Sequence, residues 1–274
     1  ERAFARAALA HYADFGHSLI YAVKAGELIQ GLGPSVEMPL ALALARSLVY
    51  ATREDLIPEF RDYAAALASW GGEGRAPAAA DYRSLNERRA LALTAAHGGA
   101  DPLDLYGALL GANAHNLLAF DIALQSRLDQ PVADNANWLD VTHGITFAQA
   151  VRRQCSKFPE LWPQGLLQMA CFAGRNSRFN DPAVGLEHWR VADEGEFMRA
   201  TIDGLFDHGR QENIVAVHLL KTTLAVRDEL ADGVEGETRE VLLAGLNRFL
   251  RSPLPRRHIR RTVKQAMALA ALGD

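Results

Sequence analysis

An apolar, helix-like stretch from Ile214 to Leu224 carries a histidine and a lysine, two residue types that can bind a metal or move a proton. His218 and Lys221 are three residues apart, so a helix would place both side chains on one face. Two interpretations of Lys221 stay open. Its amine could reach solvent along a packed aliphatic stem, or it could be desolvated with a lowered pKa. A desolvated amine could act as a catalytic base, or react with CO2 to give a carbamate, which is an anionic oxygen ligand.

Three further histidines, His17, His115 and His143, stand in similar apolar helical segments. Neutral imidazole is a common protein ligand for iron, zinc and copper. We therefore expect these three and His218 to converge on one metal, with Lys221 close by. No short motif such as His-Glu-x-x-His joins them, so a second interpretation remains open for each: a core histidine satisfied by one hydrogen bond.

The composition is typical of a helical protein rich in alanine and leucine. The chain has 274 residues, of which 49% are hydrophobic and 8% aromatic, and its net charge is −4. This balance gives no reason to expect nucleic acid or a membrane as partner. Cys155 and Cys171 form no Cys-x-x-Cys pair, which favours reduced thiols in a cytoplasmic protein. The chain begins with Glu1, so a further upstream domain is an open alternative.

The periodicity of apolar residues, with its glycine and proline breaks, predicts helices almost throughout and no strand. They are expected over 2–31 with a break near Gly16, 35–52, 56–70, 81–96, 102 to as far as 128, 138–157, 161–172, two within 193–230, 235–251 and 256–272. The expected fold is all-α: a single domain over residues 1–274, built of antiparallel helix pairs around a buried His-rich centre. Residues 174–190 are polar and contain glycine, and are predicted to form a long loop or lid.

Other cofactor classes lack their motifs. The sequence contains no Gly-x-Gly-x-x-Gly after a strand, no P-loop and no Gly-x-Ser-x-Gly, which argues against flavin, nicotinamide, nucleotide and serine-hydrolase chemistry. It also has no cysteine cluster for electron transfer. Electrons for a redox reaction would have to come from the substrate, an electron-donor protein or an upstream domain.

Two segments resemble the questin oxidase-like family. The stretch from Gly16 to Leu28 resembles that family's His-Pro-Leu-Ile-His-Leu-Gly-Tyr-Gly segment, with serine after His17 where the family has proline. The stretch from Asp140 to Phe147 resembles its His-Gly/Ala-Val-Thr segment. The helix carrying a histidine and a lysine is similar to a late helix of the family.

The resemblance implies a flavin-independent helical oxidoreductase that acts on aromatic polyketides with non-haem iron. It implies His17, His115, His143 and His218 as iron ligands, with Lys221 as a carbamate ligand and catalytic group. We therefore expect a cytoplasmic oxygenase that uses Fe(II), O2 and a small hydrophobic aromatic substrate. A zinc-dependent hydrolase with the same histidines, or a non-catalytic helical protein-interaction module, are the alternatives.

Overall fold

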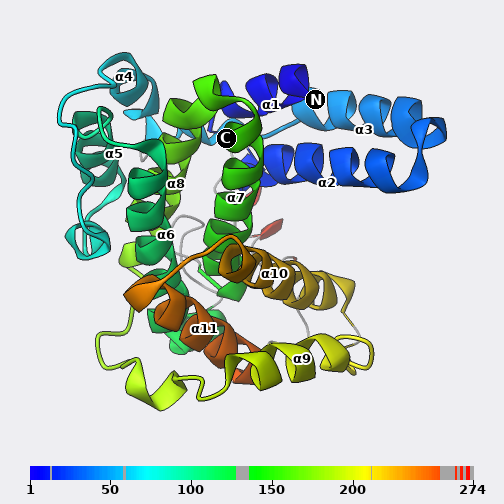
Figure 1. The fold of residues 1–274 in the computed structure, drawn as a ribbon, viewed down its shortest axis with the longest axis vertical. Coiled ribbons are helices and arrows are strands. Elements are labelled where there is room, and N and C mark those ends of the chain that lie inside the picture. The colour runs from blue at the N-terminus through cyan, green and yellow to red at the C-terminus, as the bar shows by residue number, and fades with distance from the viewer. Residues whose placement is uncertain are drawn as a thin grey trace. The chain divides into compact units, whose positions relative to one another are not determined.

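The computed structural model describes residues 1–12, 14–57, 60–127, 136–210 and 212–253, together with residues 263, 266, 267, 270 and 271. These residues contain eleven α-helices and no β-strand (Figure 1), which confirms the predicted all-α class. The helices are α1 Arg2–Leu9, α2 His17–Leu32, α3 Glu37–Val49, α4 Tyr63–Ala68, α5 Glu87–Ala96, α6 Pro102–Ala119, α7 Trp138–Lys157, α8 Trp162–Ser177, α9 Glu194–Gly204, α10 Asn213–Ala231 and α11 Gly236–Arg251. None of these helices is both long enough and apolar enough to cross a membrane.

The contacts within the chain divide it into two compact units. The first consists of Glu1–Asn113 and His143–Arg178, and the second of Ala114–Thr142 and Phe179–Asp274. Two of the three boundaries along the chain fall inside helices, α6 and α7, and the third follows the end of α8. The single domain expected over residues 1–274 stays a prediction.

In the first unit, α2 and α3 lie side by side as a helical hairpin, and α1 contacts both. Gly33, with φ of 85°, ends α2 in a backbone conformation that glycine adopts without strain, and Pro34 starts the following turn. Helix α5 packs against α8 in the same unit. A Cβ on Gly174 would lie 2.6 Å from Cα of Glu87, so a glycine is what allows the two helices to approach.

In the second unit, α9 and α11 both contact α10. Beside them, an aromatic cluster packs Trp138 against Phe120 and Phe249, with ring centroids 5.0 and 5.3 Å apart. All three rings are buried, and they form part of this unit's apolar core.

Helix α7 has the predicted bounds, but two other expectations need correction. Helix α6 ends at Ala119 instead of approaching residue 128, because Asp121 and Asp181 pair their backbone N–H groups with the carbonyls of Phe179 and Ala119. The predicted loop 174–190 starts too early, because α8 continues to Ser177. Gly174 had suggested a loop, but this glycine is needed where α8 approaches α5 closely.

Two predicted helices of the first unit are shorter than expected. Among the described residues of 56–70, the α-helical part is α4, and a 3-10 turn at Glu54–Leu56 precedes it. The segment 81–96 becomes helical at Glu87, where the Asn86 side chain accepts a hydrogen bond from the backbone N–H of Arg89. The predicted helix 256–272 lies largely outside the described residues.

Candidate metal centre

The structure brings two of the five predicted site residues together, both in the first unit. His17 is the first residue of α2 and His143 lies in α7. Their Nε2 atoms are 3.0 Å apart and their rings meet edge to face. His143 is 8% exposed and His17 is partly buried, so the pair sits at the edge of the core.

The tautomer of His17 follows from its second nitrogen. Nδ1 of His17 lies 2.6 Å from the carbonyl oxygen of Asp14. A carbonyl only accepts hydrogen bonds, so Nδ1 carries the hydrogen, and Nε2 of the neutral ring carries the lone pair. Metal-bound histidines are commonly oriented in this way, through the ring nitrogen that does not touch the metal.

An unusual turn positions His17. Asp14, Phe15 and Gly16 have successive positive φ values of 57°, 45° and 78°, a region that non-glycine residues rarely adopt. A Cβ on Gly16 would lie 2.9 Å from Cγ of Phe147 and closer still to its Cδ2. Phe147 is one helical turn after His143, so the contact that requires glycine also brings the two histidines together.

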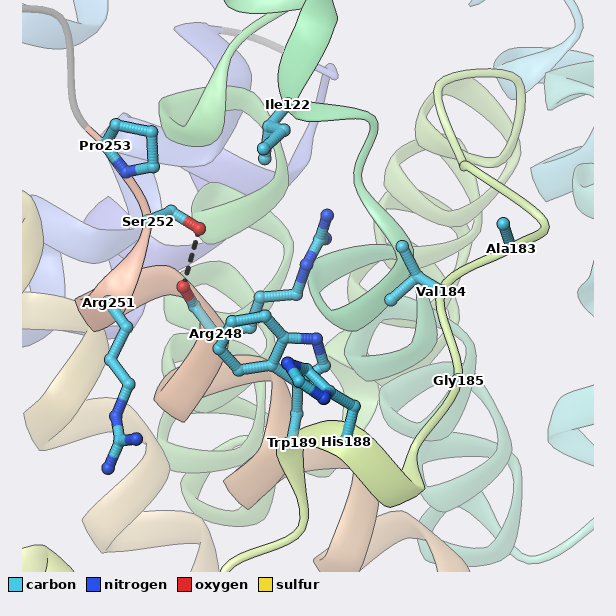
Figure 2. A pocket seen from close by; sticks show the side chains of 10 residues that line it. All are labelled: Ile122, Ala183, Val184, Gly185, His188, Trp189, Arg248, Arg251, Ser252 and Pro253. Atoms are coloured by element: carbon cyan, nitrogen blue, oxygen red, sulfur yellow. Dashed lines mark hydrogen bonds between the residues drawn. The ribbon is translucent and has the colours of Figure 1, made fainter.

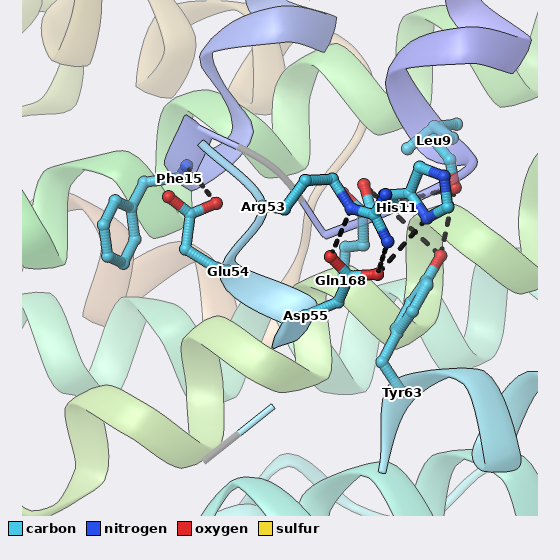
Figure 3. A network of polar contacts seen from close by, with 8 residues as sticks. All are labelled: Leu9, His11, Phe15, Arg53, Glu54, Asp55, Tyr63 and Gln168. Carbon is cyan, nitrogen blue, oxygen red and sulfur yellow. Dashed lines mark hydrogen bonds and ion pairs between the residues drawn. The ribbon is translucent and has the colours of Figure 1, made fainter. Parts of the chain in front are cut away.

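A buried carboxylate supports the same turn (Figure 3). Glu54 is 1% exposed, and its Oε2 accepts a hydrogen bond of 3.2 Å from the backbone N–H of Phe15. Burial raises the pKa of Glu54 to about 7; the hydrogen bond from Phe15 acts in the opposite direction, and the nearby charge of Asp14 adds to the increase. Sequence reasoning missed Glu54, because it lies in the charged segment Arg53-Glu54-Asp55, which gives no local signal of burial.

The chain that enters this turn is held by a second group of polar contacts (Figure 3). Gln168 of α8 donates hydrogen bonds to the carbonyls of Leu9 and His11, and Tyr63 of α4 donates to Leu9. Asp55 accepts hydrogen bonds from Arg53, which hold its pKa below the usual range against the opposing effect of burial. The end of α1 is therefore fastened to α4 and α8 just before the turn.

Tyr21 lies one turn after His17, with ring centroids 5.6 Å apart. Burial and, secondarily, the charge of Asp14 raise the pKa of Tyr21, so its hydroxyl is protonated at neutral pH. Its ring lies beside that of His17, in a position that the apolar periodicity did not single out.

The other three predicted residues belong to the second unit: His115 on α6, and His218 and Lys221 on α10. Nδ1 of His218 lies 2.6 Å from the carbonyl of Ile214, which leaves Nε2 with the lone pair by the same reasoning. Lys221 is partly buried, and burial lowers its pKa to about 7. No described residue forms an ion pair with it, so near neutral pH a substantial fraction of this amine is uncharged.

Within the described part of the chain, no three or more His, Cys, Asp and Glu side chains gather as they would around a metal ion. What fits a metal is the pair itself. Two nitrogen ligands about 2.1 Å from a metal and 90° apart are about 3.0 Å from each other, whereas a tetrahedral angle separates them by about 3.4 Å. Compared with known proteins, the chain matches no family model, no curated protein and no solved structure, so its likeness to the questin oxidase-like family stays a resemblance.

Proposed function

We propose that the protein is a metal-dependent oxidoreductase that uses non-haem iron and O2 to oxidise a small, hydrophobic, aromatic molecule. The observation that carries the proposal is the His17–His143 pair, with its Nε2 atoms 3.0 Å apart and Nδ1 of His17 committed to a carbonyl. Two core histidines joined by a hydrogen bond would have the same separation. The strained turn and the glycine contact favour a functional pair, because strained backbone is concentrated at functional sites.

In this proposal His17 and His143 hold the iron. When bound, Fe(II) with an open coordination position would supply the activation of O2. Lys221 would contribute as an uncharged amine, which can accept a proton or react with CO2 to give a carbamate. Its lowered pKa supports both roles, because only the uncharged amine accepts a proton or attacks CO2.

The ligand types favour iron over a structural zinc site. The two cysteines, Cys155 and Cys171, are fully buried, and burial raises the pKa of each thiol. A thiol held protonated is a poor metal ligand. The 3.0 Å separation also fits adjacent positions of a six-coordinate shell better than the tetrahedral arrangement that zinc prefers.

The function is tested by O2 consumption. Protein loaded anaerobically with Fe(II) is mixed with a panel of hydroxylated polycyclic aromatics in an oxygen-electrode cell. We expect O2 uptake with at least one of them, reduced about a hundredfold or more in His143→Ala and retained in His11→Ala, whose exposed ring lies outside the pair. Ester hydrolysis by the zinc-loaded protein, with no O2 uptake by the iron form, would support the hydrolase alternative instead.

A further inference from the structure

The second unit contains a hollow of about 320 Å³ that the proposed metal chemistry does not use (Figure 2). Its walls are mostly apolar, and they come from the segment after α6, the loop before α9 and the end of α11. Ten residues line it: Ile122, Ala183, Val184, Gly185, His188, Trp189, Arg248, Arg251, Ser252 and Pro253. The volume is that of a site for a small organic molecule.

One buried cation faces into this hollow. Arg248 of α11 is 4% exposed, and Figure 2 shows its side chain reaching in among Ile122, Val184 and Trp189. The guanidinium lies 6.0 Å from the ring centroid of Trp189. Arg251, by contrast, is exposed and points outward.

The hydrogen bonds of Arg248 are only partly satisfied by the protein. Its Nη1 donates to the carbonyls of Leu118 and Phe120, at 2.6 and 2.7 Å. Among the residues that the structure describes, Nε and Nη2 have no hydrogen-bond partner and no carboxylate forms an ion pair with the guanidinium. A buried guanidinium is stabilised when a planar anion accepts from two of its N–H groups at once.

The charges around Arg248 define the class of anion. Asp121 and Asp181 act on the guanidinium electrostatically from beyond ion-pair distance. A ligand with two negative charges would be repelled by both carboxylates while facing one inward cation. A single carboxylate is repelled less by these two groups than a dianion is, and it can accept from Nε and Nη2 together.

We propose that this hollow binds a small organic monocarboxylate with an apolar or aromatic body. The carboxylate pairs with Arg248, and the body lies against Trp189, Val184 and Ile122. The site is in the second unit and needs no metal, so it stands or fails independently of the proposed oxygenase.

Three matched probes test the proposal by isothermal titration calorimetry and ligand-observed NMR: 1-naphthoate, the neutral 1-naphthamide and the dianionic 1-naphthyl phosphate. We expect 1-naphthoate to bind with a Kd of about 0.1–1 mM, at least about tenfold more tightly than either other probe. His143→Ala should bind 1-naphthoate as well as the wild type does. Equal or tighter binding of the amide or the phosphate, or no saturable binding of the naphthoate, would overturn the proposal.

Two substitutions locate the site. Val184→Trp fills the hollow with an indole and leaves the residue at position 248 unchanged, so it should abolish naphthoate binding while leaving the melting temperature unchanged. Val49→Trp adds the same ring at a position that is 78% exposed and outside the hollow, and should bind like the wild type. If Val184→Trp binds as the control does, the carboxylate is bound elsewhere and the assignment to Arg248 is wrong.

Discussion

Gly16 is the last residue of the turn before His17, and its substitution tests how the His17–His143 pair is positioned. In Gly16→Ala the backbone must keep a φ of 78°, which costs an alanine about 1–2 kcal/mol. The new methyl group also meets the Phe147 ring at less than contact distance, and overpacking of this kind costs about 1–3 kcal/mol. We therefore expect a loss of about 2–5 kcal/mol in the free energy of unfolding.

A matched control lies on the same helix. Gly31 has no atom within 4 Å of an added Cβ, and its φ is not positive. Gly31→Ala should therefore stabilise α2 by about 0.5–1 kcal/mol, the usual gain for alanine inside a helix. Both variants are compared with the wild type by urea unfolding, with the m value checked for constancy.

A double-mutant cycle separates the two costs. Phe147→Ala alone should lose about 3–5 kcal/mol, since it empties a core site. Adding Gly16→Ala to that background should cost only the backbone term of about 1–2 kcal/mol, because the ring is gone. If Gly16→Ala costs the same in both backgrounds, the Phe147 ring is not the reason for the glycine, and the explanation of how α2 meets α7 is refuted.

For three further substitutions, the structure predicts the direction of the change in stability. Lys221→Met removes a partly buried amine whose pKa is lowered from 10.5 to about 7 by burial. The cost of burying this amine is complete below pH 7 and disappears as the pH rises toward 10.5. In urea unfolding, methionine should therefore stabilise the protein by about 2 kcal/mol more at pH 6 than at pH 9. The pKa of Glu54 is raised from 4.5 to about 7, so the stability that this group gives is complete below pH 4.5 and is lost as the pH rises through 7. The free energy of unfolding of Glu54→Gln, relative to the wild type, should therefore increase by about 2–3 kcal/mol between pH 4.5 and pH 8. A difference between the two proteins that does not change with pH would contradict the burial of this carboxylate. Gly174→Ala should lower the melting temperature instead of raising it, with a cost of about 1–3 kcal/mol, because its methyl group would meet the backbone of Glu87.

Much of the helical framework could be predicted from the sequence, because apolar periodicity and local breaks are sequence-local signals. Helix α7 has the predicted bounds, and the breaks near Gly16 and between α9 and α10 lie where they were expected. The end of α6 could not be predicted, since it depends on backbone hydrogen bonds between residues far apart in the chain, those of Asp121 with Phe179 and of Asp181 with Ala119.

The candidate site could be predicted only in part. Apolar surroundings singled out His17 and His143, and the structure brings these two together. The break near Gly16 was predicted, but its left-handed conformation was not. The burial of the charged side chains of Glu54 and Arg248 gave no signal in the sequence either. Their roles arise from burial by distant elements, which no local pattern encodes.

The convergence of His115, His218 and Lys221 on the His17–His143 pair remains a prediction. The lone pairs assigned to Nε2 of His17 and His218 make both rings suitable ligands.

The most direct test of the central claim is the metal content of protein purified without a metal-affinity tag, measured by elemental mass spectrometry before and after anaerobic incubation with Fe(II) and desalting. We expect stoichiometric iron in the wild type and in His11→Ala, and its loss in both His17→Ala and His143→Ala, with circular dichroism confirming that each variant is folded. A wild type that holds no metal after reconstitution, or histidine variants that keep it, would show that the pair is a hydrogen-bonded element of the core. Stoichiometric zinc in place of iron would contradict the oxygenase assignment while keeping the site.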